Sequence, residues 1–262
     1  MPKVRKVVEE PPPPPAKRFG KEVVLPSGLV TPTERKRYQA TLGTQVSMHQ
    51  IATRRNAVVE SIAGNMMRWH RDPWEMIQDG VIYTLDQVNM KQPIKTFPTQ
   101  PYLKELSHEW LENKLLLVAK SRRMTVSWLM CFLHLWLTMF HEGIAAFIVS
   151  DSERKSAELI QRCEFIYDHI PEDVMLKPKI RSKHCLLEFP GLNSFLMGIP
   201  EGADQLRGYT ATALLFDEFA FWDKPRESLG AARPCIDGGG RVTIVSSPLE
   251  GPFQDLVFDN TM

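Results

Sequence analysis

Residues 120–127, Lys-Ser-Arg-Arg-Met-Thr-Val-Ser, have the character of a phosphate-binding loop with its lysine at the front. An apolar run over 115–119 precedes the loop, and a helix-length apolar run over 128–140 follows it. A strand, a tight loop and a helix in this order direct backbone N–H groups and a helix N-terminus at one point, where a polyphosphate binds well. The segment therefore predicts a nucleotide site.

The position of the lysine departs from the usual phosphate-loop motif, G-x-x-x-x-G-K-[ST]. When the last position of that motif is aligned on Ser127, Lys120 replaces the first glycine and Thr125 the second. Val126 takes the place of the usual lysine. A threonine strains any loop conformation that needs a positive φ. The residues expected to contact phosphate, by side chain or backbone amide, are Lys120, Ser121, Arg122, Thr125, Val126 and Ser127.

Two acids follow another apolar run and supply groups that such a site needs. The run over 213–216 leads into Asp217 and Glu218, and a strand that ends in this way places carboxylates at the edge of a sheet where ligands bind. Asp217, with Ser127, is predicted to hold Mg²⁺, and Glu218 to deprotonate a water that attacks the γ-phosphate of ATP. A strand that simply ends in solvated acids is the alternative.

Two further segments contain residues that can act on a phosphate. Ser246 and Ser247 end an apolar run over 242–246, and their hydroxyls can bind a γ-phosphate or its attacking water. A strand that enters a turn at Ser-Ser-Pro is the alternative. Arg207, beside a glycine and just before the acidic run, can reach the phosphate of a neighbouring subunit as an arginine finger. A surface salt bridge explains Arg207 equally well.

Composition excludes several classes of protein. The chain of 262 residues is long enough for one large domain and a tail, and its 43% hydrophobic content supports a real core. A net charge of +1 gives no global field that marks a nucleic-acid or membrane binder. The longest apolar run, 128–140, is too short to span a bilayer. Four cysteines without a CxxC pair favour reduced thiols in a cytoplasmic protein.

The sequence divides into three predicted regions. Residues 1–45, which contain the proline run Pro11–Pro15 and an excess of Lys and Arg, are predicted to form a disordered basic tail. Residues 46–110 are predicted to form a helical N-terminal or lid subregion. Residues 111–262 are predicted to form a phosphate-loop ATPase core.

Local patterns predict the elements of the last two regions. The first predicted elements are an amphipathic helix from about 46 to 71, a short helix and strand within 74–85, a loop over 91–101 and a helix over 102–110. Strands then follow over 115–119, 144–150, 213–216 and 242–246, helices over 126–141 and 152–170, and a hairpin over 184–199. Ser150 and Glu153 fit a capping box for the second of these helices. Apolar strands separated by helices predict an α/β fold with a mostly parallel sheet covered on both faces.

Taken together, these segments resemble the ATPase domain of the large terminase subunit of tailed bacteriophages, the motor that packages DNA into proheads. The resemblance covers roughly residues 74–253 and depends on the order and spacing of several motifs. They are Asp72-Pro-Trp, Phe97-Pro with Tyr102-Leu, Lys120-Ser-Arg-Arg-Met-x-x-Ser-Trp128, Ser150-Asp-Ser-Glu-Arg154, Leu206-Arg-Gly-Tyr209, Leu215-Phe-Asp-Glu-Phe-Ala-Phe221, and Ser246-Ser-Pro with Gly251. The fold that the resemblance implies is a P-loop NTPase of the ASCE type.

The resemblance also implies roles for particular residues. In that family the lysine at the front of the loop still reaches the β- and γ-phosphates, as Lys120 would. Arg123 matches a loop arginine implicated in hydrolysis, and Arg207 matches one proposed to act in trans on the next subunit. The pair Ser246-Ser247 matches the motif that couples hydrolysis to movement, and Gln100 is the candidate for a glutamine that contacts adenine.

Further implications concern cofactors and partners. The resemblance implies ATP and Mg²⁺ as cofactors, and double-stranded DNA, a portal protein and a small terminase subunit as partners. It implies a homo-oligomeric ring that assembles on the prohead portal in the host cytoplasm, with no membrane. The family's C-terminal nuclease domain is expected to be absent, because the chain stops at Met262, and an excised ATPase domain is the expected reason.

Two other classes of protein stay open. A helicase-like nucleic-acid translocase shares the phosphate loop and the acidic pair, but it needs further motifs and a second motor domain. A catalytically inactive nucleotide-fold module that only docks partners is suggested by Thr125 and Val126. The presence of both Asp217 and Glu218 argues against that module, because an idle site has no chemical need for the pair.

Overall fold

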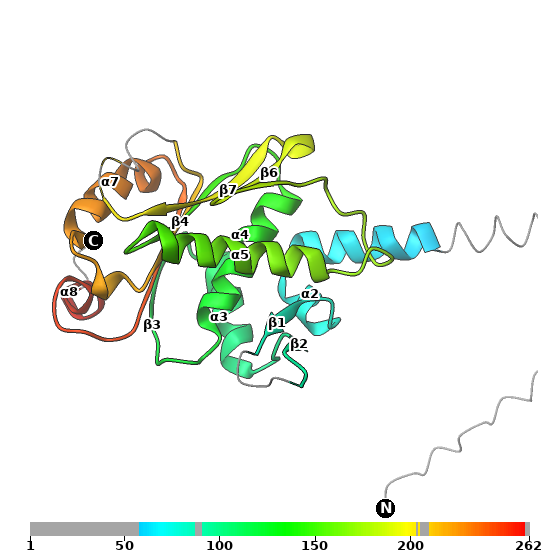
Figure 1. Ribbon diagram of the computed structural model, residues 1–262, viewed down its shortest axis with the longest axis horizontal. Coiled ribbons are helices and arrows are strands. Elements are labelled where there is room, and N and C mark those ends of the chain that lie inside the picture. Colours follow the sequence, from blue (N-terminus) through cyan, green and yellow to red (C-terminus); the bar gives the residue numbers. More distant parts are fainter. Residues whose placement is uncertain (1–57, 87–90, 203, 205–209, 260–262) are drawn as a thin grey trace, which may run out of the picture. The chain divides into compact units, whose positions relative to one another are not determined.

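The structure is a computed structural model that describes residues 58–86, 91–202, 204 and 210–259 (Figure 1). The predicted tail over 1–45, the first part of the predicted helix from 46 and the segment that contains Arg207 lie outside the described residues. The division of the chain at residues 45 and 110 stays a prediction.

A seven-stranded sheet organises the described residues. Its strands, in spatial order, are β3 (Leu115–Ala119), β9 (Arg241–Ser246), β8 (Ala213–Asp217), β4 (Ala145–Ser150), β7 (Ser194–Pro200), β6 (Leu186–Phe189) and β5 (Arg181–Lys183). The first five are parallel, and β6 and β5 continue the sheet in antiparallel pairing. The carboxyl ends of β3, β9 and β8 therefore meet at one edge, where ligands bind in sheets of this kind.

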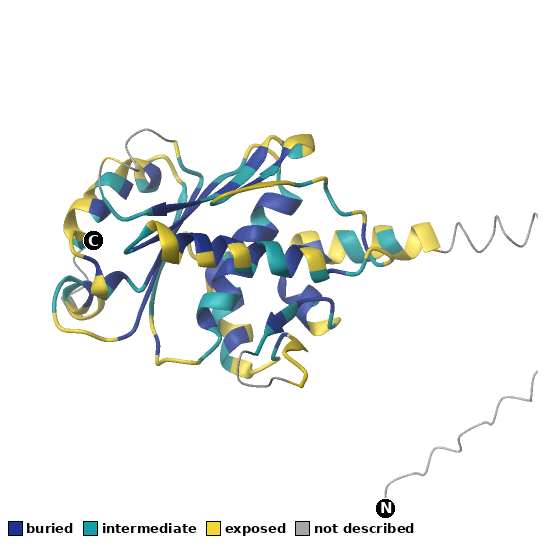
Figure 2. Cartoon of the chain, viewed as in Figure 1, coloured by how far each residue is buried: buried dark blue, intermediate teal, exposed yellow. Residues whose placement is uncertain are grey.

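Two layers of helix cover the sheet because its apolar strands present side chains to both faces. The helices α3 (Pro101–Glu112), α4 (Val126–Phe140) and α5 (Glu153–His169) share one hydrophobic cluster with residues such as Ile148 and Leu215. Alternate residues, such as Phe147 and Phe216, belong to a second cluster with α7 (Pro225–Asp237) and α8 (Pro252–Asp259). Figure 2 shows the buried residues concentrated in the inner strands of the sheet, such as β4, β8 and β9, and in α4. The predicted α/β fold with helices on both faces is confirmed.

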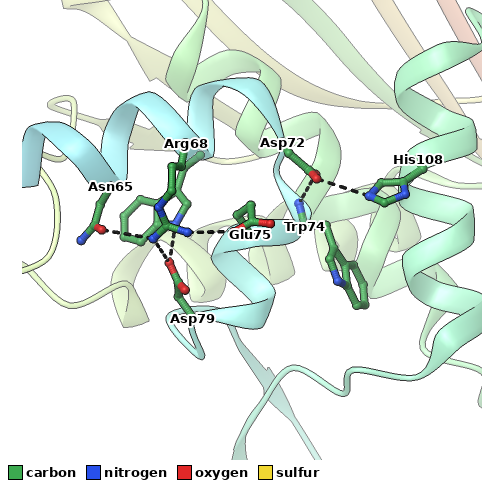
Figure 3. Close-up of polar contacts among 8 residues, drawn as sticks. Asn65, Arg68, Asp72, Trp74, Glu75, Asp79 and His108 are labelled. Atoms are coloured by element: carbon green, nitrogen blue, oxygen red, sulfur yellow. Dashed lines mark hydrogen bonds and ion pairs between the residues drawn. The ribbon is translucent and has the colours of Figure 1, made fainter. Parts of the chain in front are cut away.

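The segment before the sheet is fixed by a network of polar contacts (Figure 3). A helix over 58–71 leads into α2 (Trp74–Gln78), and β1 (Tyr83–Leu85) pairs antiparallel with β2 (Ile94–Thr96). Arg68 bonds to Glu75 and to Asp79, with N–O distances of 2.8 and 2.6 Å. His108 of α3 lies 3.3 Å from the carboxylate of Asp72. These contacts hold the end of the first helix against α2 and α3.

Helix α3 is fixed to the sheet at its C-terminal end. The indole N–H of Trp110 donates a hydrogen bond of 3.0 Å to Thr243 Oγ1 in β9. The guanidinium of Arg241, at the start of β9, stacks 4.0 Å from the centre of the Trp110 ring and donates to backbone carbonyls at the end of α3. Burial lowers the pKa of Arg241 to about 10.

Two local predictions were wrong. Residues 91–101 contain the strand β2 rather than loop alone, because Ile94–Thr96 pair with β1. Ser150 does not cap α5: it is the last residue of β4, the helix begins at Glu153 after Ser152, and the Ser152 hydroxyl donates to Asp151 instead. The predicted hairpin within 184–199 is confirmed by the antiparallel pairing of β6 and β7, joined by a 3₁₀ turn at Pro190–Leu192.

Among the described residues, no helix combines the length and the apolar character that crossing a bilayer requires.

Candidate nucleotide-binding site

The predicted phosphate loop connects β3 to α4 at the carboxyl edge of the sheet. Lys120 follows β3 directly, and its backbone N–H donates to the carbonyl of Ser246 at the end of β9, at 3.0 Å. Thr125 is the N-cap residue of α4, which begins at Val126. The N-terminus of this helix and the amides of the loop are thus placed for an anion, as the order strand–loop–helix predicts.

The backbone of the loop is strained at two residues. Arg123 has φ +64° and Thr125 has φ +60°, both in the left-handed region that favours glycine. Thr125 occupies the position at which the usual motif has its second glycine, so the expected conflict between side chain and backbone is present. Strained residues of this kind cluster at ligand-binding and catalytic sites.

The side chain of Lys120 turns to the acidic strand. Its Nζ lies 2.5 Å from Oε1 of Glu218, and the lysine side chain is only 8% exposed. The other oxygen of Glu218, Oε2, accepts a hydrogen bond of 3.1 Å from the backbone N–H of Ser247. Burial alone would raise the pKa of Glu218, but these contacts with Lys120 and Ser247 outweigh it and leave the pKa below its ordinary value. The carboxylate is therefore ionised and held by two partners.

The turn after β8 explains how Glu218 reaches these partners. Glu218 has φ +53°, and it is followed by a 3₁₀ helix over Phe219–Phe221. The turn is fixed on both sides, because Trp222 Nε1 donates to the Asp217 carbonyl at 3.1 Å and Ala220 N donates to Ser246 Oγ at 3.0 Å. The strain at Glu218 is thus maintained by packing and hydrogen bonds around it.

Asp217 and Ser127 form a second pair beside the first. Ser127 Oγ donates a hydrogen bond of 2.9 Å to Asp217 Oδ1. Burial raises the pKa of Asp217, and the Ser127 hydrogen bond and the nearby Lys120 charge offset only part of this effect. A buried carboxylate next to a hydroxyl offers two oxygen ligands of the type that Mg²⁺ prefers.

The other predicted site residues lie in different environments. Ser121, Arg122 and Arg123 are exposed in the loop, and the Val126 side chain is buried in the core, so Val126 offers a ligand only its backbone. Gln100 is exposed at the N-cap of α3 and makes no capping hydrogen bond with its side chain.

The two predicted serines differ in the state of their hydroxyls. Ser246 Oγ already accepts from Ala220, so it supports the turn that presents Glu218. Ser247 Oγ is buried and makes no well-formed hydrogen bond with the described residues, although it lies near enough to Glu218 to help lower the pKa of that carboxyl. Its backbone N–H binds Glu218 at the same time. An unpaired buried hydroxyl beside the acidic pair is the kind of group that a bound phosphate or water would satisfy.

Sequence reasoning missed one residue at the site. Tyr102, in the first turn of α3, donates a hydrogen bond of 3.0 Å from its hydroxyl to the carbonyl of Met124 in the loop. Met124 lies between the two strained residues Arg123 and Thr125. The motif Phe97-Pro with Tyr102-Leu contains this tyrosine, but nothing in its spacing predicts a contact with a loop that lies 22 residues further along the chain.

Comparison with solved structures shows where this fold occurs. A mutant of the large terminase ATPase domain of Thermus phage P74-26 matches with a TM-score of 0.50 at 13% identity, over 61% of this chain and 70% of that one. The large terminase of bacteriophage HK97 matches with a TM-score of 0.51 at 12% identity, over 70% of this chain and 40% of that one. At these identities the similarity establishes the fold. A search of curated protein sequences gave no significant match.

The sequence itself carries the family signal. The profile described as "Terminase large subunit, T4likevirus-type, N-terminal" matches residues 118–252. This range is just over half of the chain and includes the loop, the acidic pair and the two serines. The chain therefore belongs to the T4likevirus-type family of terminase large subunits, of which it contains the N-terminal ATPase domain.

Proposed function

We propose that the domain hydrolyses ATP·Mg²⁺ and that hydrolysis drives double-stranded DNA into a prohead. The observation that carries the proposal is the contact between Lys120 and Glu218, which joins the phosphate loop to the acidic strand at 2.5 Å. The pair Ser127 and Asp217 lies at the same edge of the sheet. A cation for phosphate, two oxygens for a metal and a carboxylate base are the groups that phosphoryl transfer to water requires.

In this proposal the β- and γ-phosphates bind at the N-terminus of α4. The backbone amides from Ser121 to Ser127 donate hydrogen bonds to the phosphate oxygens, and the ammonium of Lys120 offsets part of their negative charge. Ser127 and Asp217 would hold Mg²⁺, which would offset the negative charge that develops on the phosphates during the reaction. Metal binding also requires an ionised Asp217, and the positive charge of the ion favours that form against the cost of burial.

The proposed base is Glu218, and its pairing with Lys120 has a direct consequence. A carboxylate that is bound to an ammonium and to a backbone N–H is a weak base, because both contacts lower its pKa. A γ-phosphate that attracts the Lys120 ammonium takes one of these partners away. The pKa of Glu218 then rises, and its Oε1 is free to accept a proton from the attacking water. Nucleotide binding and activation of the base are thereby linked through one lysine.

The remaining roles follow from the family. Arg123, exposed in the loop, is proposed to stabilise the transferring phosphoryl group in cis, and Arg207 to do so in trans from a neighbouring subunit. The unpaired hydroxyl of Ser247 is proposed to detect the γ-phosphate or its water. Gln100 is proposed to contact adenine. A ring of such subunits on a portal protein, with a small terminase subunit as a further partner, would move DNA through sequence-independent phosphate contacts.

The proposal is tested by ATP turnover with Glu218→Gln and Lys120→Ala, measured with and without DNA. Glu218→Gln should reduce turnover by roughly 10²- to 10⁴-fold, the usual contribution of a general base, and should still bind ATP. Lys120→Ala should reduce both turnover and ATP affinity. Lys114→Ala is the matched control, because Lys114 lies at the opposite end of β3 and bonds to the carbonyl of Gly239.

Each outcome distinguishes the proposal from the other classes. Unchanged turnover in Glu218→Gln would remove Glu218 as the base. ATP binding without turnover in wild type, on assembled portal and DNA, would favour the docking module. Turnover stimulated by single-stranded rather than double-stranded DNA would favour the helicase-like translocase.

A further inference from the structure

A second group of metal-ligating side chains lies away from the nucleotide site. His184 and Cys185 form the turn between β5 and β6, and Glu153 is the first residue of α5. One ligand atom from each of the three side chains lies within 4.8 Å of the other two. His184 Nε2 and Glu153 Oε1 are 3.4 Å apart. Two elements that are separated by about 30 residues of chain therefore bring an imidazole, a thiol and a carboxylate together.

The backbone at Cys185 is unusual for a cysteine. Lys183 pairs with Leu186, so that His184 and Cys185 are the two central residues of a tight hairpin turn. Cys185 has φ +56°, a conformation for which such turns normally use glycine or asparagine. In a regular strand, adjacent side chains point to opposite faces. The left-handed residue interrupts this alternation and allows the thiol to lie on the same side as the neighbouring imidazole.

Gly198 of β7 contacts both the turn that carries His184 and Cys185 and the helix α5 that carries Glu153. Its N–H donates a hydrogen bond of 2.8 Å to the Cys185 carbonyl, which fixes the turn. A Cβ at this position would lie 2.9 Å from both the Ile160 side chain and the Ser156 carbonyl, so the absence of a side chain allows α5 to pack closely on β7. The turn and the start of α5 are thus positioned against the same residue of the sheet.

We propose that Glu153, His184 and Cys185 form a binding site for one Zn²⁺ ion. Imidazole nitrogen, thiolate sulfur and carboxylate oxygen are the ligands that Zn²⁺ takes in proteins, and three of them with one water complete a tetrahedral site. Exposed Glu153 and His184 leave the fourth position open to solvent. The bound ion ties the β5–β6 turn to the N-terminal end of α5, a function separate from ATP hydrolysis.

The distances require only a small adjustment. In a tetrahedral zinc site with bonds of about 2.0–2.3 Å, neighbouring ligand atoms are roughly 3.5 Å apart. The 3.4 Å between His184 and Glu153 already meets this value. The other separations are within 4.8 Å, so they have to close by at most about 1.3 Å, which rotation of the side chains can supply.

The test is a titration of the full chain, reduced with a non-thiol reductant, with Co²⁺ as a spectroscopic probe for zinc. We expect one equivalent of Co²⁺ to produce the thiolate-to-metal charge-transfer absorption and the visible bands of tetrahedral cobalt, and Zn²⁺ to displace it. Cys185→Ser should abolish the charge-transfer band, and His184→Ala should weaken Zn²⁺ binding by at least about tenfold in calorimetry.

Two control variants separate this site from other thiols and acids. Cys235→Ser changes a buried cysteine elsewhere in the fold, and Glu158→Gln changes an exposed acid of α5 outside the group. Both should bind Co²⁺ as wild type does. Absence of the charge-transfer band in wild type, or its persistence in Cys185→Ser, would overturn the proposal. Circular dichroism of each variant confirms that a loss of binding is not a loss of fold.

Discussion

The hydroxyl of Tyr102 donates a hydrogen bond of 3.0 Å to the carbonyl of Met124 and so joins the start of α3 to the phosphate loop. The acceptor lies between Arg123 and Thr125, the two loop residues with positive φ. A carbonyl in such a loop has no helical partner, and the tyrosine satisfies it. The contact stabilises a loop conformation that is otherwise unfavourable.

Tyr102→Phe should therefore weaken ATP binding more than it weakens the fold. Loss of one hydrogen bond costs about 1 kcal/mol, which corresponds to roughly a fivefold higher KM for ATP if the loop must be reordered on binding. Steady-state kinetics across ATP concentration measures the change. Tyr167→Phe is the control, because it removes a comparable bond, of 2.6 Å to the Pro178 carbonyl, away from the loop. An equal rise of KM in both variants would contradict the prediction.

Thr125→Gly should stabilise the domain. A residue with a side chain in the left-handed region costs roughly 1–2 kcal/mol of stability. The greater freedom of glycine in the unfolded chain lowers the stability gained by the substitution by about 0.5–1 kcal/mol. The net gain is about 0.5–1 kcal/mol, or a rise in Tm of roughly 1–4 °C for a domain of this size. Thr125→Ala retains the Cβ and should give no such gain. Thermal denaturation of the three proteins checks the prediction, and equal Tm values for Gly and Ala would refute it.

Asp217→Asn should raise stability while it abolishes Mg²⁺-dependent nucleotide binding. Burial raises the pKa of Asp217 in the folded protein. The protonated carboxyl therefore contributes its full stability below the unfolded-state pKa of about 3.9, and this contribution is lost as the pH rises through the pKa of the folded state. Asparagine has no charge to bury and can still accept the Ser127 hydrogen bond. In the absence of Mg²⁺, the Tm difference should be positive at pH 7 and should shrink toward zero near pH 4. A lower Tm for the variant than for wild type at neutral pH would contradict this prediction.

Ser247→Ala should reduce turnover without loss of stability. The Ser247 hydroxyl is buried and makes no well-formed hydrogen bond with the described residues. Its removal leaves Glu218 bonded to Lys120 and to the Ser247 backbone N–H, so no buried group loses its last partner. Ser246→Ala is the matched comparison: it removes the acceptor of the Ala220 N–H and should destabilise the domain by about 1 kcal/mol. Denaturant unfolding together with ATP turnover separates the two effects. Full turnover in Ser247→Ala would exclude a role of its hydroxyl in the reaction.

The sheet was predictable from sequence because most of its parallel strands are continuous apolar runs. The runs at 115–119, 213–216 and 242–246 correspond to β3, β8 and β9 within one residue at each end. The short strand β5 was missed, since Arg-Ser-Lys carries no apolar signal and forms a strand only through its pairing with β6. Propensity is overridden by tertiary context most easily in such short, exposed elements.

The site was predictable in its residue types but not in its contacts. The order of Lys120, Asp217 and Glu218 along the chain indicates a nucleotide site, yet the contact between Lys120 and Glu218 depends on the left-handed turn at Glu218. No local rule predicts that conformation for a glutamate, because the cost is met by neighbours such as Trp222 and Ser246. The hydrogen bond from Tyr102 likewise requires knowledge of how α3 packs.

Helix α3 has both ends anchored, and this has a mechanical consequence. Its first turn holds the phosphate loop through Tyr102, and its last turn is attached to β9 through Trp110 and Arg241. The helix spans about 12 Å between Tyr102 and Trp110, at 1.5 Å for each residue. The opposite end of β9 leads to Ser246 and Ser247, beside the loop again. Helix α3 and strand β9 are thus linked to each other and to the loop. A displacement of the loop would therefore move α3 and, through Trp110 and Arg241, the start of β9 at the opposite edge of the sheet.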